Sequence, residues 1–161
     1  MSIYIFSRPI HSGKTTALQQ WCNTQKNILG ILMPDIKGSR KVLDIGTKEI
    51  FDIECVDRAS TTEALTLIGK YNFYTAAFEK GNSILLHALS QKPDWLIIDE
   101  IGKLELLGKG FYASAFEAIR LYNDSDEKFN LLITVRDFLC EEVISFFNIK
   151  NYKVIDNLND L

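Results

Sequence analysis

One stretch of the chain, Ser7 to Thr16, constrains the fold more than any other. It follows an apolar run, Ile3–Phe6, that is typical of a strand, and it precedes Ala17–Cys22, which is typical of the first turns of a helix. A strand, a tight loop, Gly-Lys-Thr and a helix form the context of a phosphate-binding loop. The backbone N–H groups and the dipole of such a helix start favour a bound anion. The sequence therefore predicts a phosphate site here. An ordinary helix start with threonines is the less favoured alternative.

Each position of this loop has an expected role. The residues that we expect to contact phosphates are Pro9, Ile10, His11, Ser12, Gly13, Lys14, Thr15 and Thr16. Gly13 allows close approach of the backbone, Lys14 would reach the β- and γ-phosphates, and the Thr15 hydroxyl would bind Mg²⁺. The pattern G-x-x-x-x-G-K-[ST] begins with a glycine, and Arg8 stands in its place. This replacement costs little if the φ angle of Arg8 is negative, and it could put a cation beside the phosphates.

Length and composition restrict the class of protein. A chain of 161 residues suits one domain, and we expect a single domain over residues 1–161. The net charge of −3 argues against a general nucleic-acid or anionic-membrane surface. No signal peptide is visible, and no apolar run approaches the roughly 20 residues that span a bilayer. Cys22, Cys55 and Cys140 have no metal spacing, so we expect reduced thiols in a cytoplasmic protein.

Apolar runs typical of strands alternate with segments typical of helices. Strands are expected at 2–6, 28–33, 94–99, 130–135 and 152–155, and helices at about 14–26, 76–91, 111–122 and 139–147. Short strands at 42–49 and 50–55 predict a β-hairpin insertion over about 34–56. Residues 60–68 fit either a short capped helix or a loop. The alternation predicts an α/β fold with a mainly parallel sheet, whose ligands bind at the carboxyl ends of the strands.

A second motif ends the strand expected at 94–99. Leu96-Ile97-Ile98-Asp99-Glu100 is a Walker B pattern, in which Asp99 would hold Mg²⁺ opposite Thr15. Glu100 could accept a proton from a water molecule and orient it in line with the γ-phosphate. This is a feature of hydrolases, because a kinase uses the hydroxyl of its acceptor as the nucleophile. A solvated strand end is the less favoured alternative.

The stretch from 98 to 106, Ile-Asp-Glu-Ile-Gly-Lys-Leu-Glu-Leu, resembles small P-loop nucleoside-triphosphatases of the cancer-related nucleoside-triphosphatase type. Segments 35–47, 69–79 and 132–136 resemble the same family in the same order. The resemblance implies a RecA-like three-layer α/β/α core, dependence on Mg²⁺, and slow hydrolysis of several nucleoside triphosphates to the diphosphate and phosphate. Arg8 and His11 depart from the glycine or small residues that are usual in the family's loop.

Three basic side chains near the expected site have two possible roles each. Arg136, at a strand end, could stabilise charge on the γ-phosphate or could form a salt bridge with Asp137 or Glu141. Arg40 could approach phosphates or remain solvated, and Lys103 could hold the Walker B glutamate or merely cap the site.

Aromatic residues give little information about the base. Tyr71, Phe73 and Trp95 could stack on one, although core packing is their more common fate. No Asn-Lys-x-Asp guanine motif is present, and we expect a broad base preference.

Together these features predict a Mg²⁺-dependent phosphohydrolase that acts on ATP, GTP or other nucleoside triphosphates. The expected catalytic residues are Glu100, Lys14 and Arg136, and the expected metal ligands are Thr15 and Asp99. One alternative is a nucleoside or nucleotide kinase, whose acceptor site would lie within residues 35–60. Another is a nucleotide-binding regulatory module that does not hydrolyse its ligand, which Arg8 and His11 favour.

Overall fold

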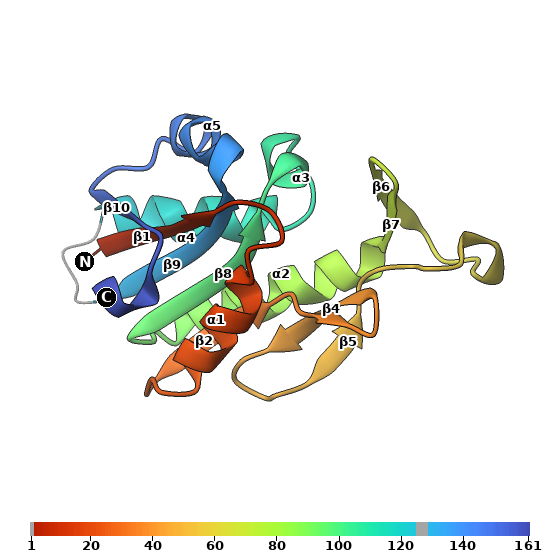
Figure 1. Cartoon of the computed structure of the whole chain (residues 1–161), viewed down its shortest axis with the longest axis horizontal. Coiled ribbons are helices and arrows are strands. Elements are labelled where there is room, and N and C mark those ends of the chain that lie inside the picture. The colour runs from red at the N-terminus through yellow and green to blue at the C-terminus, as the bar shows by residue number, and fades with distance from the viewer. Residues whose placement is uncertain (1, 125–128) are drawn as a thin grey trace.

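Figure 1 shows the fold as a computed structural model that describes residues 2–124 and 129–161. The strands are β1 (Ser2–Arg8), β2 (Ile28–Leu32), β3 (Asp35–Ile36), β4 (Ser39–Asp44), β5 (Ile50–Asp52), β6 (Leu65–Ile68), β7 (Tyr71–Tyr74), β8 (Trp95–Ile101), β9 (Asn130–Arg136) and β10 (Tyr152–Ile155). The helices are α1 (Lys14–Cys22), α2 (Thr75–Ser90), α3 (Lys103–Leu106), α4 (Tyr112–Asp124) and α5 (Cys140–Phe146), with 3-10 turns η1 (Arg58–Ser60), η2 (Asp137–Leu139) and η3 (Leu158–Asp160). The predicted alternation of strands and helices is therefore confirmed, with small shifts of the bounds.

Most of the described strands belong to one sheet. Its order is β10-β1-β9-β8-β2-β4-β3, and β5 pairs with β4. From β10 to β2 the strands run parallel, and β4 runs antiparallel to β2. The carboxyl ends of the parallel strands therefore meet at one edge. β9 lies between β1 and β8, so the strand before the phosphate loop and the Walker B strand are not neighbours.

The alternation of side chains along the parallel strands builds a core on each face of the sheet. Ile5 of β1 and Ile98 of β8 point into the core beneath α2, α4 and α5. Their neighbours Phe6 and Ile97 point into the core beneath α1 and η3. Figure 1 shows α1 on the near face of the sheet and α2 and α4 on the far face. The fold is thus the three-layer α/β/α arrangement that the sequence predicted.

The predicted hairpin is present as β4 and β5. The two strands pair antiparallel, with Leu43 opposite Ile50. Asp44 closes the turn, because its carboxylate accepts hydrogen bonds from the backbone of Gly46 and from the hydroxyl of Thr47. Since β4 also pairs with the carboxyl-terminal end of β2, the hairpin extends the main sheet beyond β2.

Two boundaries differ from the sequence prediction. The helix expected to reach about residue 26 ends at Cys22, where Thr24 bonds back to the carbonyl of Trp21 through both its N–H and its hydroxyl. Of the two alternatives predicted for residues 60–68, the short helix is wrong, because Leu65–Ile68 forms strand β6 and pairs with β7. Gly69, with a φ of 56°, supplies the turn between them. A local turn therefore ends the first helix early, and strand pairing with β7 replaces the second.

Within the part of the chain that the structure describes, no helix has both the length and the apolar character needed to cross a membrane.

Candidate functional site

The phosphate loop joins β1 to α1 at the carboxyl edge of the sheet. α1 begins at Lys14, and Gly13 precedes it in a left-handed conformation with a φ of 76°. The Lys14 amine donates hydrogen bonds to the carbonyls of Arg8 and Pro9, at 3.1 and 3.0 Å from Nζ. The loop is therefore folded around the end of the lysine side chain. Burial lowers the pKa of Lys14, and the negative charges of Glu100 and Asp99 act in the opposite direction.

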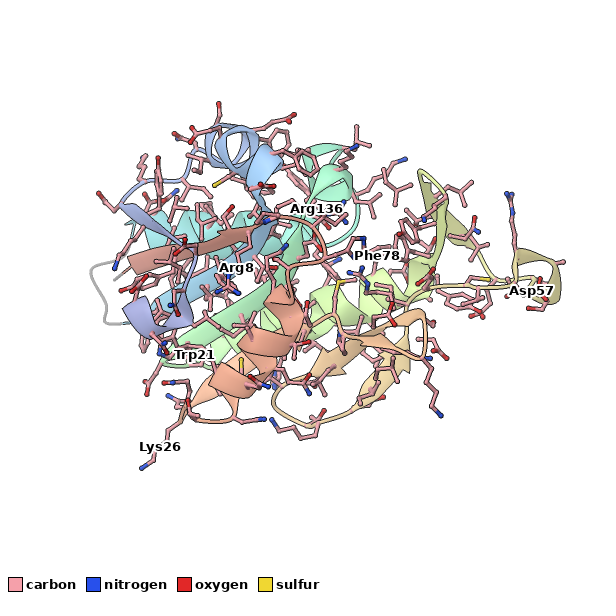
Figure 2. The ribbon with its side chains drawn as sticks, in the orientation of Figure 1. Arg8, Trp21, Lys26, Asp57, Phe78 and Arg136 are labelled. Carbon is pink, nitrogen blue, oxygen red and sulfur yellow. The ribbon has the colours of Figure 1, made fainter. Side chains whose placement is uncertain are left out.

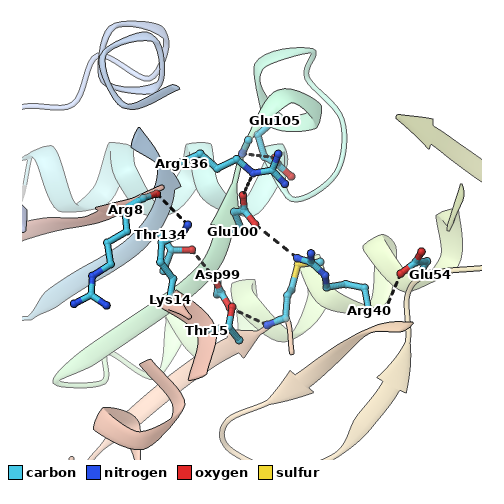
Figure 3. Close-up of polar contacts among 12 residues, drawn as sticks. Arg8, Lys14, Thr15, Arg40, Glu54, Asp99, Glu100, Glu105, Thr134 and Arg136 are labelled. Atoms are coloured by element: carbon cyan, nitrogen blue, oxygen red, sulfur yellow. Dashed lines mark hydrogen bonds and ion pairs between the residues drawn. The ribbon is translucent and has the colours of Figure 1, made fainter. Parts of the chain in front are cut away.

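Arg8 fits the loop without backbone strain. Positive φ angles in the loop occur at His11 and Gly13 and not at Arg8. The guanidinium of Arg8 lies 4.9 Å from the centre of the Phe6 ring, and its Nε donates to the carbonyl of Asp156. Figure 3 shows it pointing away from Lys14 and Asp99. In this structure the guanidinium of Arg8 therefore lies against Phe6 and Asp156 and not beside the predicted phosphate and metal ligands.

His11 is the non-glycine residue of the loop that has a positive φ angle. Its φ is 58°, in the left-handed region that glycine adopts most easily. Histidine is among the residues that enter this region more often than most others. A histidine can therefore occupy position 11, where the related family usually has glycine or another small residue, without preventing the loop from folding.

The two predicted metal ligands touch each other. The Thr15 hydroxyl donates to Oδ2 of Asp99 at 2.9 Å, although the residues are far apart in sequence. The backbone N–H of Met33 donates to the same oxygen at 3.0 Å, and the Thr134 hydroxyl donates to Oδ1 at 2.5 Å. Asp99 is only 1% exposed. Its burial raises its pKa, which the hydrogen bonds partly oppose.

These donors have the chemistry of a magnesium site. Mg²⁺ prefers oxygen ligands and is usually held by one or two protein groups together with substrate phosphates. The hydroxyl of Thr15 and the carboxylate of Asp99 are such ligands, beside a loop suited to phosphates. A cation here would also favour the ionised form of the buried Asp99. Among the described residues, no group of three or more His, Cys, Asp and Glu side chains forms a separate metal cluster.

Asp99 and Glu100 lie at an irregularity of β8. The register with β9 shifts between Ile98 and Ile101. Both isoleucines pack into the core beneath α2 and α4, although regular alternation would send residues three apart to opposite faces. A bulge of this kind re-aims side chains. Here Asp99 turns toward α1, while Glu100 turns toward the end of β9 and the β4 strand (Figure 3).

Glu100 lies between two arginines. The Nε of Arg136 donates to Oε1 of Glu100 at 2.7 Å, and Nη1 of Arg40 lies 3.7 Å from Oε2. The side chain of Glu100 is 18% exposed. Arg136 thus pairs with Glu100 rather than with Asp137 or Glu141. The predicted catalytic residues Lys14, Glu100 and Arg136 come from three separate elements and meet at one edge of the sheet.

Several residues of this region were not singled out by their sequence pattern. Thr134 was one polar residue in an apolar strand, and that exception was its only signal. The contact of Arg40 with Glu100 left no local signal. Glu105 is 4% exposed and accepts hydrogen bonds from the backbone of Gly102 and Phe111. Its role is to fold the segment that follows β8.

The aromatic residues divide between the two ends of the sheet. Trp95 begins β8 and packs against Trp21, with ring centres 4.9 Å apart, so it is a core residue. Figure 2 shows Trp21 at the end of the sheet opposite Arg136. Tyr71 and Phe73 instead line a cavity of about 420 Å³ that also includes Glu100, Arg40 and Arg136. The phosphate-loop residues 9–16 do not line it.

Comparisons with known proteins agree with the fold and identify the family. The crystal structure of THEP1 from the hyperthermophile Aquifex aeolicus has a similar fold, with a TM-score of 0.72 at 21% sequence identity over 97% of this chain and 89% of that chain. A search of curated proteins found no match. The model of a family described as NTPase matches residues 3–156. Because that match spans nearly the whole chain, this protein belongs to the NTPase family.

Proposed function

We propose that this protein is a Mg²⁺-dependent phosphohydrolase that converts nucleoside triphosphates, with broad base preference, to the diphosphate and phosphate in the cytoplasm. The observation that carries the proposal is the position of Glu100. It follows Asp99, which contacts Thr15 at the start of α1, and it is held by Arg136 at 2.7 Å. This arrangement supports a role for the Glu100 carboxylate beside the γ-phosphate that the phosphate loop would hold.

The loop would bind the phosphates of the substrate. Backbone N–H groups of residues 9–16 and the start of α1 suit an anion. Lys14, whose amine now contacts the carbonyls of Arg8 and Pro9, would turn to the β- and γ-phosphates. Exchange of neutral carbonyl partners for phosphate oxygens is favourable, because the positive charge of the amine would then face negatively charged acceptors.

Thr15 and Asp99 would hold the metal. When bound, Mg²⁺ neutralises charge on the β- and γ-phosphates. Thr134 and the N–H of Met33 would keep the Asp99 carboxylate in its orientation. A fixed carboxylate loses less conformational entropy when it binds a cation.

Glu100 would act on the attacking water. The water gives a proton to the carboxylate while its oxygen bonds to the γ-phosphorus. The bond from the γ-phosphorus to the bridging oxygen breaks, and the diphosphate leaves. Arg136 would hold Glu100 through Nε, and its guanidinium would stabilise charge on the transferring group.

Glu100→Gln tests this proposal. The amide keeps the shape of the side chain, so binding of triphosphate and Mg²⁺ should remain. Phosphate release in a single turnover should fall by about 10²–10⁴, the usual contribution of a positioned general base. Glu117→Gln, on the exposed face of α4, is the matched control and should behave as wild type. Equal and clearly non-zero rates in wild type and Glu100→Gln would remove Glu100 from the mechanism.

The same measurement distinguishes the proposed hydrolase from the two alternative functions that the sequence left open. A nucleoside or nucleotide kinase would turn over appreciably only with an acceptor present, and the loss in Glu100→Gln would appear only then. A regulatory module without hydrolysis would leave wild type and variant equally inert while both bind the triphosphate.

A further inference from the structure

The cavity beside Glu100 has an aromatic wall. Phe73 and Phe78 meet edge to face with ring centres 5.7 Å apart, and Phe78 meets Phe111 in the same way at 5.1 Å. Tyr71 stacks on Phe73 at 6.0 Å. These rings come from β7, α2 and the loop before α4, and all four line the cavity. Aromatic rings that pack in offset or edge-to-face pairs can extend that packing to a further ring, so the wall suits a planar apolar group.

The polar side chains of the same cavity carry excess positive charge. Its cations are Arg40, Lys70, Lys103 and Arg136, and its carboxylates are Glu54, Glu100 and Glu105. Both oxygens of Glu105 accept backbone hydrogen bonds, and burial raises its pKa to about 7. Within the described residues, neither lysine has an ion pair, and Lys70 lies over the Tyr71 ring with its amine 5.3 Å from the ring centre. An anion in this cavity would therefore find cations that no carboxylate holds.

From these observations we infer that the cavity binds a small aromatic anion, and that the bound anion speeds hydrolysis at the neighbouring phosphate site. The coupling follows from Arg40, which lines the cavity and lies 3.7 Å from Glu100. An anion in the cavity competes with Glu100 for Arg40. The carboxylate keeps its shorter contact with Arg136 at 2.7 Å, and its second oxygen becomes free to accept a proton from water.

Binding is tested with three probes that separate the ring from the charge. The probes are naphthalene-2-sulfonate, which has both, naphthalene-2-methanol, which has the ring alone, and inorganic sulfate. The protein is first saturated with a non-hydrolysable triphosphate analogue and Mg²⁺, so that the phosphate loop is filled. Calorimetry should show the sulfonate binding at one site, at least tenfold more tightly than the other two probes.

Two pairs of lysine substitutions locate the site. Lys70→Ala combined with Lys103→Ala should weaken sulfonate binding at least fivefold. Lys26→Ala combined with Lys109→Ala, which removes two exposed lysines outside the cavity, should leave it unchanged. Equal binding to both double variants would overturn the inference, and so would equal binding of the neutral probe. Competition between the sulfonate and the triphosphate analogue would do the same, because the cavity would then hold the base of the nucleotide.

The coupling is tested by phosphate release from wild type with and without saturating naphthalene-2-sulfonate. The rate should rise at least twofold, and an unchanged or lower rate would overturn the coupling. This part rests on the proposed hydrolytic role of Glu100, whereas the binding measurement does not. Failure of the proposed function would appear as no hydrolysis without the probe, and failure of the cavity site would appear as no saturable binding.

Discussion

The buried carboxyl of Glu105 should make this protein less stable as the pH rises from 4.5 to about 7. Glu105 lies in α3, the short helix that follows β8, and is 4% exposed. Its oxygens accept hydrogen bonds from the N–H groups of Gly102 and Phe111, at 2.8 and 2.9 Å. Burial raises its pKa from 4.5 to about 7, and the negative charge of Glu100 adds to this effect.

The size of the effect follows from the two pKa values. Between pH 4.5 and about 7 the folded protein holds a proton on Glu105 that the unfolded chain has released. The free energy of unfolding therefore falls as the pH rises through this window, and it is steady below and above it. The difference between 4.5 and about 7 corresponds to about 3 kcal/mol at roughly 1.4 kcal/mol per unit.

Glu105→Gln isolates this contribution, because glutamine resembles the protonated acid and does not ionise. Urea unfolding of wild type and variant should be measured from pH 4.5 to 8, without nucleotide. The stability of the variant relative to wild type should increase by about 3 kcal/mol across that range. Glu141→Gln, at an exposed position of α5, controls for the loss of a carboxylate and should show no such trend. A difference between Glu105→Gln and wild type that stays constant with pH would refute the reasoning.

Three further predictions concern the phosphate loop, the sheet and the catalytic pair. Lys14→Ala should keep the circular dichroism spectrum of wild type and should weaken triphosphate binding about 10- to 100-fold, since a charge-assisted hydrogen bond contributes about 1.5–3 kcal/mol. Wild-type hydrolysis in a folded Lys14→Ala protein would refute the assignment of the phosphate loop. Gly30→Ala puts a Cβ 2.1 Å from a carbonyl oxygen of β8 and should cost about 1–3 kcal/mol more than Gly38→Ala, which also has a positive φ but open space; equal unfolding midpoints would contradict this. Arg136→Ala should slow phosphate release by about 10²–10³, and adding it to Glu100→Gln should cost little more, because the two side chains act as a unit; additive losses would show that they act separately.

The sequence determined the features whose signals are local. The phosphate loop and the Walker B strand are short motifs, in which each residue type is required by chemistry at a fixed distance from its neighbours. The alternation of apolar runs with helical patterns likewise predicted the layered α/β fold, because each element shows its own periodicity. These signals placed Lys14 and Thr15 at the start of a helix, and Asp99 and Glu100 at the end of a strand.

Only the tertiary structure decided which of those ends touch. The insertion of β9 between β1 and β8 brings Thr134 against Asp99 and Arg136 against Glu100, and strand order leaves no trace in local periodicity. The strand β6 forms because β7 is there to pair with it, whereas the local pattern of residues 60–68 predicted a short capped helix or a loop. The cavity beside Glu100 is built from segments spread over most of the chain. Its rings and cations lie together because the fold brings these segments into contact. Contacts between residues so far apart in sequence are fixed by packing and not by any local pattern.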